Sequence, residues 1–219
     1  MIIFALNFFV IMISKAKIKY IHSLEQKKYR IRENVFVAEG PKVVGDLLAS
    51  ITPKILIHTE NWTTTVSMPE TEDIVVSETE LKKISFLQHP QEVMAVFPQM
   101  ACLSTVVSPE KDLILALDNI QDPGNLGTII RVADWFGIRR IVCSPDTVDV
   151  YSPKVIQATM GSIARVIMEY TDLTKFIHGL PPGIPIYGTL LDGENIYESN
   201  LSSHGVIVMG NEGNGISAD

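Results

Sequence analysis

The stretch "LDNIQDPGNLGTIIRVADWFGI", residues 117–138, sets the architecture of the C-terminal half of the chain. It joins the end of a strand to a turn and then to a helix, because Asp, Pro and Gly in succession are typical of a turn that opens a helix. The helix carries apolar residues on more than one face, which predicts that it is well buried. Arg131 lies among them, and an unpaired guanidinium in an apolar core is unfavourable by several kcal/mol.

Two explanations of Arg131 are compatible with this spacing. Asp134 follows three residues later and could pair with Arg131 along the helix. Alternatively, Arg131 points into a site that holds an anion or a reacting hydroxyl group, with the Asn125 amide beside it and Glu212 as a countercharge. Helix geometry alone leaves both explanations open.

The strands and helices expected on either side of this stretch alternate along the chain, which predicts the α/β class. From residue 112 onward, continuous apolar runs such as "LILAL" indicate a parallel sheet covered on both faces. A smaller α/β unit is expected over residues 14–98, beginning with one helix from Ser14 to about Arg32 and including a helix with a capping box at Ser77 and Glu80. A polar linker, residues 99–111, joins the two.

Two glycine-bearing turns follow strands of the second unit, "DPGNLG" (122–127) and "GNEGNG" (210–215). Open parallel sheets bind ligands at the carboxyl ends of their strands, where such turns gather. Neither turn has the spacing of a phosphate-binding P-loop or of a dinucleotide site. Either turn alone could be an ordinary tight turn.

Charge is unevenly distributed. The chain has a net charge of −7, which argues against binding nucleic acid over its whole surface. Residues 14–33, however, hold only two acidic residues and seven basic ones, which could contact a polyanion or form a solvated helix face. The basic residues are Lys15, Lys17, Lys19, Lys27, Lys28, Arg30 and Arg32.

The N-terminal thirteen residues, "MIIFALNFFVIMI", contain one polar residue. They are shorter than the roughly 20 apolar residues that span a bilayer, and they lack the pattern of a signal peptide. We expect an extension upstream of a start at Met12, with a short membrane-associating segment as the alternative, and no stable membrane association. The two cysteines, Cys102 and Cys143, have no metal-ligand spacing and suit a reduced, cytoplasmic protein.

Longer motifs resemble one family. The stretch "DNIQDPGNLGTIIRVADWFG" resembles the first motif of the SpoU (TrmH-like) RNA ribose methyltransferases, and "IVMGNEGNGIS" resembles their second motif, a strand followed by G-x-E-x-x-G-I/L-S. "YSPKVIQATMGSIARV" matches the segment between them. "YIHSLEQKKYRIRENVFVAEGPKVVGDLL" resembles the RNA substrate-binding domain often fused to the family. The similarity covers about residues 14–219.

The resemblance implies transfer of a methyl group from S-adenosylmethionine to a ribose 2′-hydroxyl of rRNA or tRNA. It implies a SPOUT methyltransferase domain with a C-terminal trefoil knot, a homodimer when the enzyme is full length, and no metal. Arg131 would be the catalytic arginine, Asn125 would position the substrate, and Glu212 would hold an arginine. The cofactor would be lined by Thr189, Leu190, Met209, Gly210 and Asn211, and the seven basic residues would contact RNA phosphates.

The sequence departs from the family pattern after Ser217, because the third motif, which starts the last helix and completes the knot, is absent. We therefore expect an incomplete methyltransferase domain over residues 112–219 that lacks its knot segment. The alternative function is a non-catalytic RNA-binding protein derived from such an enzyme.

Overall fold

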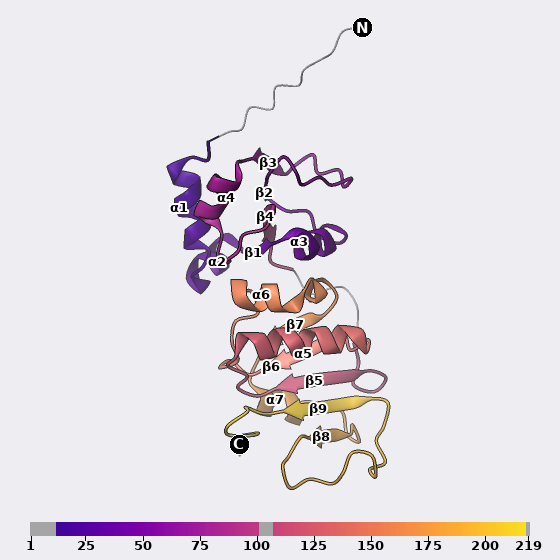
Figure 1. Cartoon of the computed structure of the whole chain (residues 1–219). Helices are drawn as coiled ribbons and strands as arrows, with labels where there is room; N and C mark the ends of the chain where they lie inside the picture. Colours follow the sequence, from indigo (N-terminus) through magenta and orange to yellow (C-terminus); the bar gives the residue numbers. More distant parts are fainter. Residues whose placement is uncertain (1–11, 101–106, 218–219) are drawn as a thin grey trace. The chain divides into compact units, whose positions relative to one another are not determined.

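The computed structural model describes residues 12–100 and 107–217 (Figure 1). The chain divides into two compact units, residues 1–99 and 100–219. Most of the predicted N-terminal extension, and residues 101–106 of the predicted linker with Cys102, lie outside the described residues. No helix within the described ranges is long and apolar enough to span a bilayer.

The N-terminal unit is built on a four-stranded sheet of order β1-β4-β2-β3. β4 pairs antiparallel with β1 and β2, whereas β2 and β3 run parallel. The strands are β1 (Val35–Glu39), β2 (Ile55–His58), β3 (Glu72–Val75) and β4 (Val93–Pro98). The helices are α1 (Lys15–Ser23), α2 (Lys27–Glu33), α3 (Pro41–Leu48) and α4 (Glu78–Ile84). The predicted small α/β unit is therefore present.

The single helix predicted from Ser14 to Arg32 is wrong, because the chain breaks after Ser23 and restarts at Lys27. Leu24 is fully buried in this break. The Arg30 guanidinium donates hydrogen bonds to the carbonyls of Leu24 at 2.7 Å and Glu25 at 2.6 Å. Carbonyls that a continuous helix would have bonded internally are thus satisfied by a side chain from the next helix.

The capping box predicted for α4 is half correct. Ser77 Oγ accepts a hydrogen bond from the Glu80 N–H at 3.2 Å, so Ser77 is the N-cap. The second hydrogen bond of a capping box, from the Ser77 N–H to the Glu80 carboxylate, is not formed. The Glu80 carboxylate is buried and accepts from the Ile13 N–H at 3.2 and 3.3 Å, and so ties the chain before α1 to α4.

The C-terminal unit holds a five-stranded sheet of order β7-β6-β5-β9-β8, in which every neighbouring pair is parallel. Its strands are β5 (Leu113–Leu117), β6 (Arg140–Cys143), β7 (Ile167–Tyr170), β8 (Ile186–Gly188) and β9 (Gly205–Met209). Its helices are α5 (Pro123–Trp135), α6 (Pro153–Thr159), the single 3₁₀ turn η1 (Ser162–Ala164) and α7 (Leu173–His178). The parallel sheet predicted from the apolar runs is confirmed.

Helices cover the central strands of this sheet (Figure 1). Ile114 of β5 and Val208 of β9 belong to one core cluster, against which Phe176 and Ile177 of α7 pack. Alternate residues of a strand face opposite sides, so Leu115 and its counterparts form the second face. The predicted lack of a knot-forming segment concerns where the chain ends, and it stays a prediction.

α5 and α6 approach each other closely at Gly127. A Cβ atom at this position would lie 2.3 Å from Ala158 Cβ and 2.9 Å from the Ala158 carbonyl carbon. Only glycine allows the two helix backbones to come this near. The contact fixes the position of α5, the helix that carries Asn125 and Arg131.

Candidate active site

The turns that follow β5 and β9 lie side by side at one edge of the parallel sheet. The two strands pair directly over their whole length, so their carboxyl ends coincide. Beyond the strands, the Ser217 N–H donates to Asp118 Oδ2 at 2.7 Å. Asn211 Nδ2 donates to the Asn119 carbonyl at 2.8 Å. The two segments quoted as motifs therefore form one hydrogen-bonded surface at the place where open parallel sheets bind ligands.

The turn at residues 210–215 is closed tightly and carries Glu212. Asn211 and Gly215 exchange two backbone hydrogen bonds of 2.8 Å, and Gly215 has φ +71°. A Cβ atom at Gly210 would lie 2.1 Å from the Gly215 carbonyl carbon. These glycines are thus required by the closure of the turn itself. Closure leaves the Glu212 side chain exposed.

Asn125 and Glu212 meet although they are 87 positions apart in the sequence. Asp122 is the N-cap of α5 and accepts from the Asn125 N–H at 2.9 Å, which places Asn125 in the first turn of the helix. Asn125 Nδ2 donates a hydrogen bond to Glu212 Oε1. Glu212 was expected to hold an arginine, but the partner that the structure gives it is this amide.

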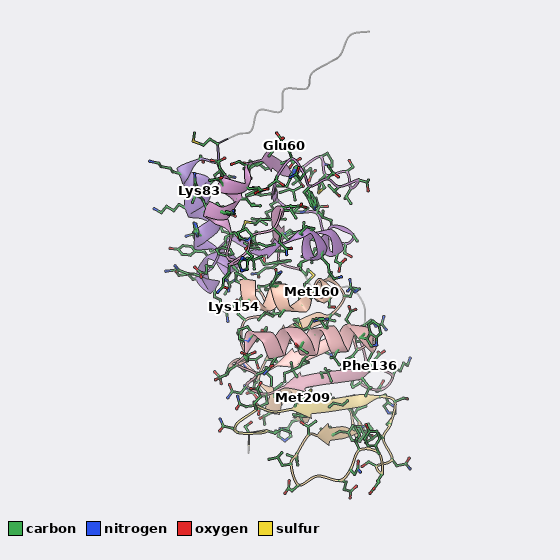
Figure 2. All side chains as sticks on the ribbon, in the orientation of Figure 1. Glu60, Lys83, Phe136, Lys154, Met160 and Met209 are labelled. Carbon is green, nitrogen blue, oxygen red and sulfur yellow. The ribbon has the colours of Figure 1, made fainter. Side chains whose placement is uncertain are left out.

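The prediction that α5 is buried on more than one face is wrong. Its fully buried stripe consists of Leu126, Gly127, Ile130 and Ala133. Arg131 is exposed. The apolar residues around it are also exposed, with fractions of 48% for Val132, 85% for Trp135 and 73% for Phe136. Figure 2 shows Phe136 at the end of α5 and Met209 at the end of β9. Arg131 therefore needs no buried counterion.

Asp134 is bonded to Arg165, so of the two explanations of Arg131 the structure does not show the pair with Asp134 along the helix. Arg165 Nε donates to Asp134 Oδ1 at 2.9 Å, and Nη2 donates to Oδ2 at 2.6 Å. The hydrogen bonds from Arg165 hold the pKa of Asp134 below its usual range, with a smaller contribution from the Ser162 hydroxyl. In the part of the chain that the structure describes, Arg131 forms no ion pair.

The five residues assigned to the cofactor lie at the carboxyl ends of β8 and β9, which are neighbours in the sheet. The Thr189 N–H donates to the Val208 carbonyl at 3.0 Å, so the pairing continues one residue beyond β8. Thr189 and Leu190 line a largely apolar cavity of about 600 Å³ that extends along β8 and the segment up to Ser202. Met209, Gly210 and Asn211 are not part of its lining and lie in the adjacent turn. Another cavity, of about 480 Å³, lies between α3 and α4 of the N-terminal unit and contains none of the predicted site residues.

Cys143, at the carboxyl end of β6, is a poor candidate for a nucleophile. It is fully buried, and burial raises the pKa of its thiol to about 12. Since the thiolate is the reactive form, the thiol is inert near neutral pH. Within the described ranges, no group of three or more His, Cys, Asp or Glu side chains could hold a metal ion.

The basic residues of the N-terminal unit differ in how available they are. Arg30 is only 2% exposed and bonds to backbone carbonyls, so it does not fit the predicted phosphate contact. Lys17 pairs with Glu72 at 2.6 Å. Lys28 and Arg32 are exposed and both lie 4.9 Å from the centre of the Tyr29 ring. Arg32 Nε also pairs with Glu33 Oε1 at 2.9 Å. The remaining three, Lys15, Lys19 and Lys27, are exposed.

Three residues of the site were not singled out from the sequence: Asp118, Asn119 and Arg165. Asp118 and Asn119 directly follow β5, and Asn119 adopts φ +56°, a conformation that asparagine tolerates better than most residues. A polar pair at a strand end was therefore a usable signal. Arg165 gave no local signal, because its partner lies 31 residues earlier.

Comparison with known proteins gives consistent matches. The model of the SpoU rRNA Methylase family matches residues 112–219, and the model of an MRM3-like substrate binding domain matches residues 15–95. The chain is 30% identical over 211 residues to the 23S rRNA (guanosine(2553)-2′-O)-methyltransferase RlmP of Bacillus subtilis, covering 92% of this chain and 82% of that protein.

Two solved structures are also similar. A putative RNA methyltransferase of the TrmH family from Porphyromonas gingivalis shares 42% identity with a TM-score of 0.83, covering 95% of this chain and 84% of that one. An AdoMet-bound rRNA methyltransferase from Sinorhizobium meliloti shares 30% identity with a TM-score of 0.78, covering 93% and 80%.

Proposed function

The chain belongs to the SpoU rRNA methylase family, and from this membership we infer that it transfers a methyl group from S-adenosylmethionine to a ribose 2′-hydroxyl of RNA. The protein is accordingly an enzyme, a methyltransferase with RNA as its substrate. The similar proteins described above are methyltransferases by name, which does not favour the non-catalytic alternative.

The observation that supports this function most directly is the contact between Asn125 and Glu212. It joins the first turn of α5 to the turn after β9, with Arg131 exposed on the same helix. An amide and a carboxylate thus meet at the carboxyl ends of two parallel strands, and the helix that begins there carries an exposed guanidinium. Such groups can orient a hydroxyl and stabilise the charge that develops on it.

Arg131 is proposed to act on the ribose hydroxyl. A guanidinium stays protonated at neutral pH, so it serves as a hydrogen-bond donor and a fixed positive charge. A donor aimed at a developing alkoxide lowers the barrier more than it stabilises the neutral hydroxyl. Asn125, held by Glu212, is proposed to fix the ribose beside Arg131, so that the attacking oxygen is aligned before reaction.

The cofactor site is proposed at the ends of β8 and β9. The bound cofactor supplies an electrophilic methyl group on a sulfonium. The apolar cavity beside Thr189 and Leu190 suits an adenosyl group, since ligand pockets are mostly apolar with a few placed polar groups. Met209, Gly210 and Asn211 contribute backbone groups from the adjacent turn. In this proposal the methyl donor lies beside the turn that carries Glu212.

The RNA surface is proposed on α2, where Lys28 and Arg32 flank Tyr29, together with the exposed members of the basic segment. Positive charges beside an aromatic ring suit RNA, because phosphates provide affinity and bases stack on rings. Replacing Lys28 and Arg32 by alanine is expected to weaken RNA binding and to flatten its dependence on salt by about 0.7 per lost contact. The matched control replaces Lys82 and Lys83 of α4. Equal effects of the two double variants would remove α2 from the RNA surface.

Two further properties are proposed. A homodimer is supported by the exposed apolar residues Val132, Trp135 and Phe136, which lie beside Arg131 on α5. A cytoplasmic location is supported by the free thiol of Cys143.

The reaction is tested by incubating the purified protein with rRNA and S-adenosylmethionine labelled in its methyl group. Transfer to the 2′-oxygen is expected to leave the label in dinucleotides that resist alkaline hydrolysis, because the blocked oxygen cannot attack the neighbouring phosphate. Label in alkali-sensitive nucleotides would indicate methylation of a base. Binding of RNA without any transfer would favour the non-catalytic alternative.

A further inference from the structure

Asp134 lies one helical turn beyond Arg131 on α5 and is an acidic side chain within its reach. Residues three apart on a helix are neighbours on its surface, and opposite charges at this spacing attract. An ion pair between them would occupy the guanidinium that the proposed reaction needs. In the structure, Asp134 instead forms an ion pair with Arg165.

The contact with Arg165 uses both carboxylate oxygens. Nε lies 2.9 Å from Oδ1 and 3.0 Å from Oδ2, and Nη2 lies 2.6 Å from Oδ2. A two-pronged contact of this kind is the strongest geometry available to arginine and a carboxylate. The Asp134 side chain is only 19% exposed, so little of it remains available to another cation.

Arg165 reaches Asp134 from a different element. It directly follows η1, the 3₁₀ turn that packs against α5. The pair therefore spans two segments and does not depend on the helical position of Arg131. Arg131 remains exposed on the same helix.

We propose that Arg165 is a positioning residue, which holds the Asp134 carboxylate and thereby keeps the Arg131 guanidinium available to the RNA hydroxyl. This inference rests on the proposed role of Arg131 in methyl transfer. Arg165 acts through Asp134 and contacts neither RNA nor cofactor. The alternative is a purely structural role, in which the same ion pair clamps η1 onto α5 and maintains the fold. The two roles predict different results when Asp134 is changed.

The test compares single-turnover methyl transfer by Arg165→Ala, Asp134→Asn and the double variant. Arg165→Ala frees Asp134 to pair with Arg131, and a fall of about two- to threefold in rate is expected, the scale of one exposed helical ion pair. Asp134→Asn has no carboxylate to compete for Arg131, so it and the double variant should both keep the wild-type rate. Arg165→Lys keeps a cation on Asp134 and should also retain it. A purely structural clamp predicts instead that Asp134→Asn and the double variant are as slow as Arg165→Ala, and that outcome overturns the proposal.

A second readout does not depend on turnover. In nitrogen-15 spectra of the arginine side chains, the Nε–H of Arg131 should become slower to exchange with water in Arg165→Ala and revert in the double variant. No change in Arg165→Ala would overturn the proposal even if that variant were poorly active. Arg131→Ala distinguishes a failure of the role proposed for Arg131 from a failure of the role proposed for Arg165. If it transfers methyl groups at the wild-type rate, the role proposed for Arg131 fails. If it is inactive while Arg165→Ala keeps the wild-type rate, only the role proposed for Arg165 fails.

Discussion

Replacing Gly127 by alanine is expected to destabilise the C-terminal unit. The new Cβ would lie 2.3 Å from Ala158 Cβ, whereas carbon atoms in contact are normally about 3.5–4.0 Å apart. α5 would have to move away from α6 by more than about 1 Å to restore such a distance. Because backbone atoms of Ala158 also lie in the way, we take the upper end of the usual range for overpacking, about 3 kcal/mol. Alanine favours a helix over glycine by about 1 kcal/mol, so the net loss is about 2 kcal/mol.

Gly45→Ala provides the matched control. Gly45 lies inside α3, and a Cβ there would meet no atom within 4 Å. The same chemical change should therefore raise the stability of the N-terminal unit by about 0.5–1 kcal/mol.

The assay is urea denaturation monitored by hydrogen exchange and mass spectrometry, which reports the peptides of each unit separately. Gly127→Ala should lower the urea midpoint of peptides from α5 and α6, and Gly45→Ala should raise the midpoint of peptides from α3. If Gly127→Ala raised the stability of its unit, the close approach of α5 to α6 would be refuted. The proposed fixing of Asn125 and Arg131 by this contact would then lose its basis.

Three further results are expected. In a Cys102→Ser background, Cys143 should react with iodoacetamide at pH 8 only as fast as the protein unfolds, because burial raises the pKa of its thiol to about 12; rapid labelling of the folded protein would contradict this. Arg165 holds the pKa of Asp134 below its unfolded value of about 3.9, so their pair contributes stability that is fully present above that value and is lost as the pH falls through the folded pKa. Asp134→Asn should therefore lose less stability than the wild type between pH 5 and pH 2, as measured by urea midpoints, and an unchanged acid dependence would argue against the pair. Asp122→Ala should destabilise α5 by about 1 kcal/mol, because the helix loses its N-cap. Hydrogen exchange of the backbone amides in the first turn of α5 should therefore become faster, and an unaltered exchange rate would contradict this.

The parallel sheet and the start of α5 could be predicted from local sequence. Apolar runs identify strands that are covered on both faces, and Asp122 followed by Pro123 identifies the beginning of a helix. The nearness of the turns at Asn125 and Glu212 followed from the rule that parallel strands end at a common edge. The structure adds the contact between their side chains.

The features that sequence missed depend on side-chain contacts that rules of local spacing do not describe. The break between α1 and α2 requires a buried Arg30, whose bonds to carbonyls replace those of a continuous helix. The partner of Asp134 is Arg165, which follows η1 rather than lying on α5. The spacing of residues along one helix predicts which of its own side chains are neighbours. It does not predict that a side chain from another segment, such as Arg165, binds Asp134 instead. The exposure of Trp135 and Phe136 likewise depends on which elements cover α5.

The role of Arg131 is tested most directly by single-turnover methyl transfer to RNA by Arg131→Ala. The control is Arg139→Ala, an exposed arginine of the same unit whose nearest acid, Asp112, lies 3.6 Å away. The expected result is a rate at least about 100-fold lower for Arg131→Ala, the usual effect of losing one donor that stabilises a developing oxyanion. RNA affinity and urea stability should be unchanged, and Arg139→Ala should keep the wild-type rate. A wild-type rate for Arg131→Ala would contradict the proposed mechanism.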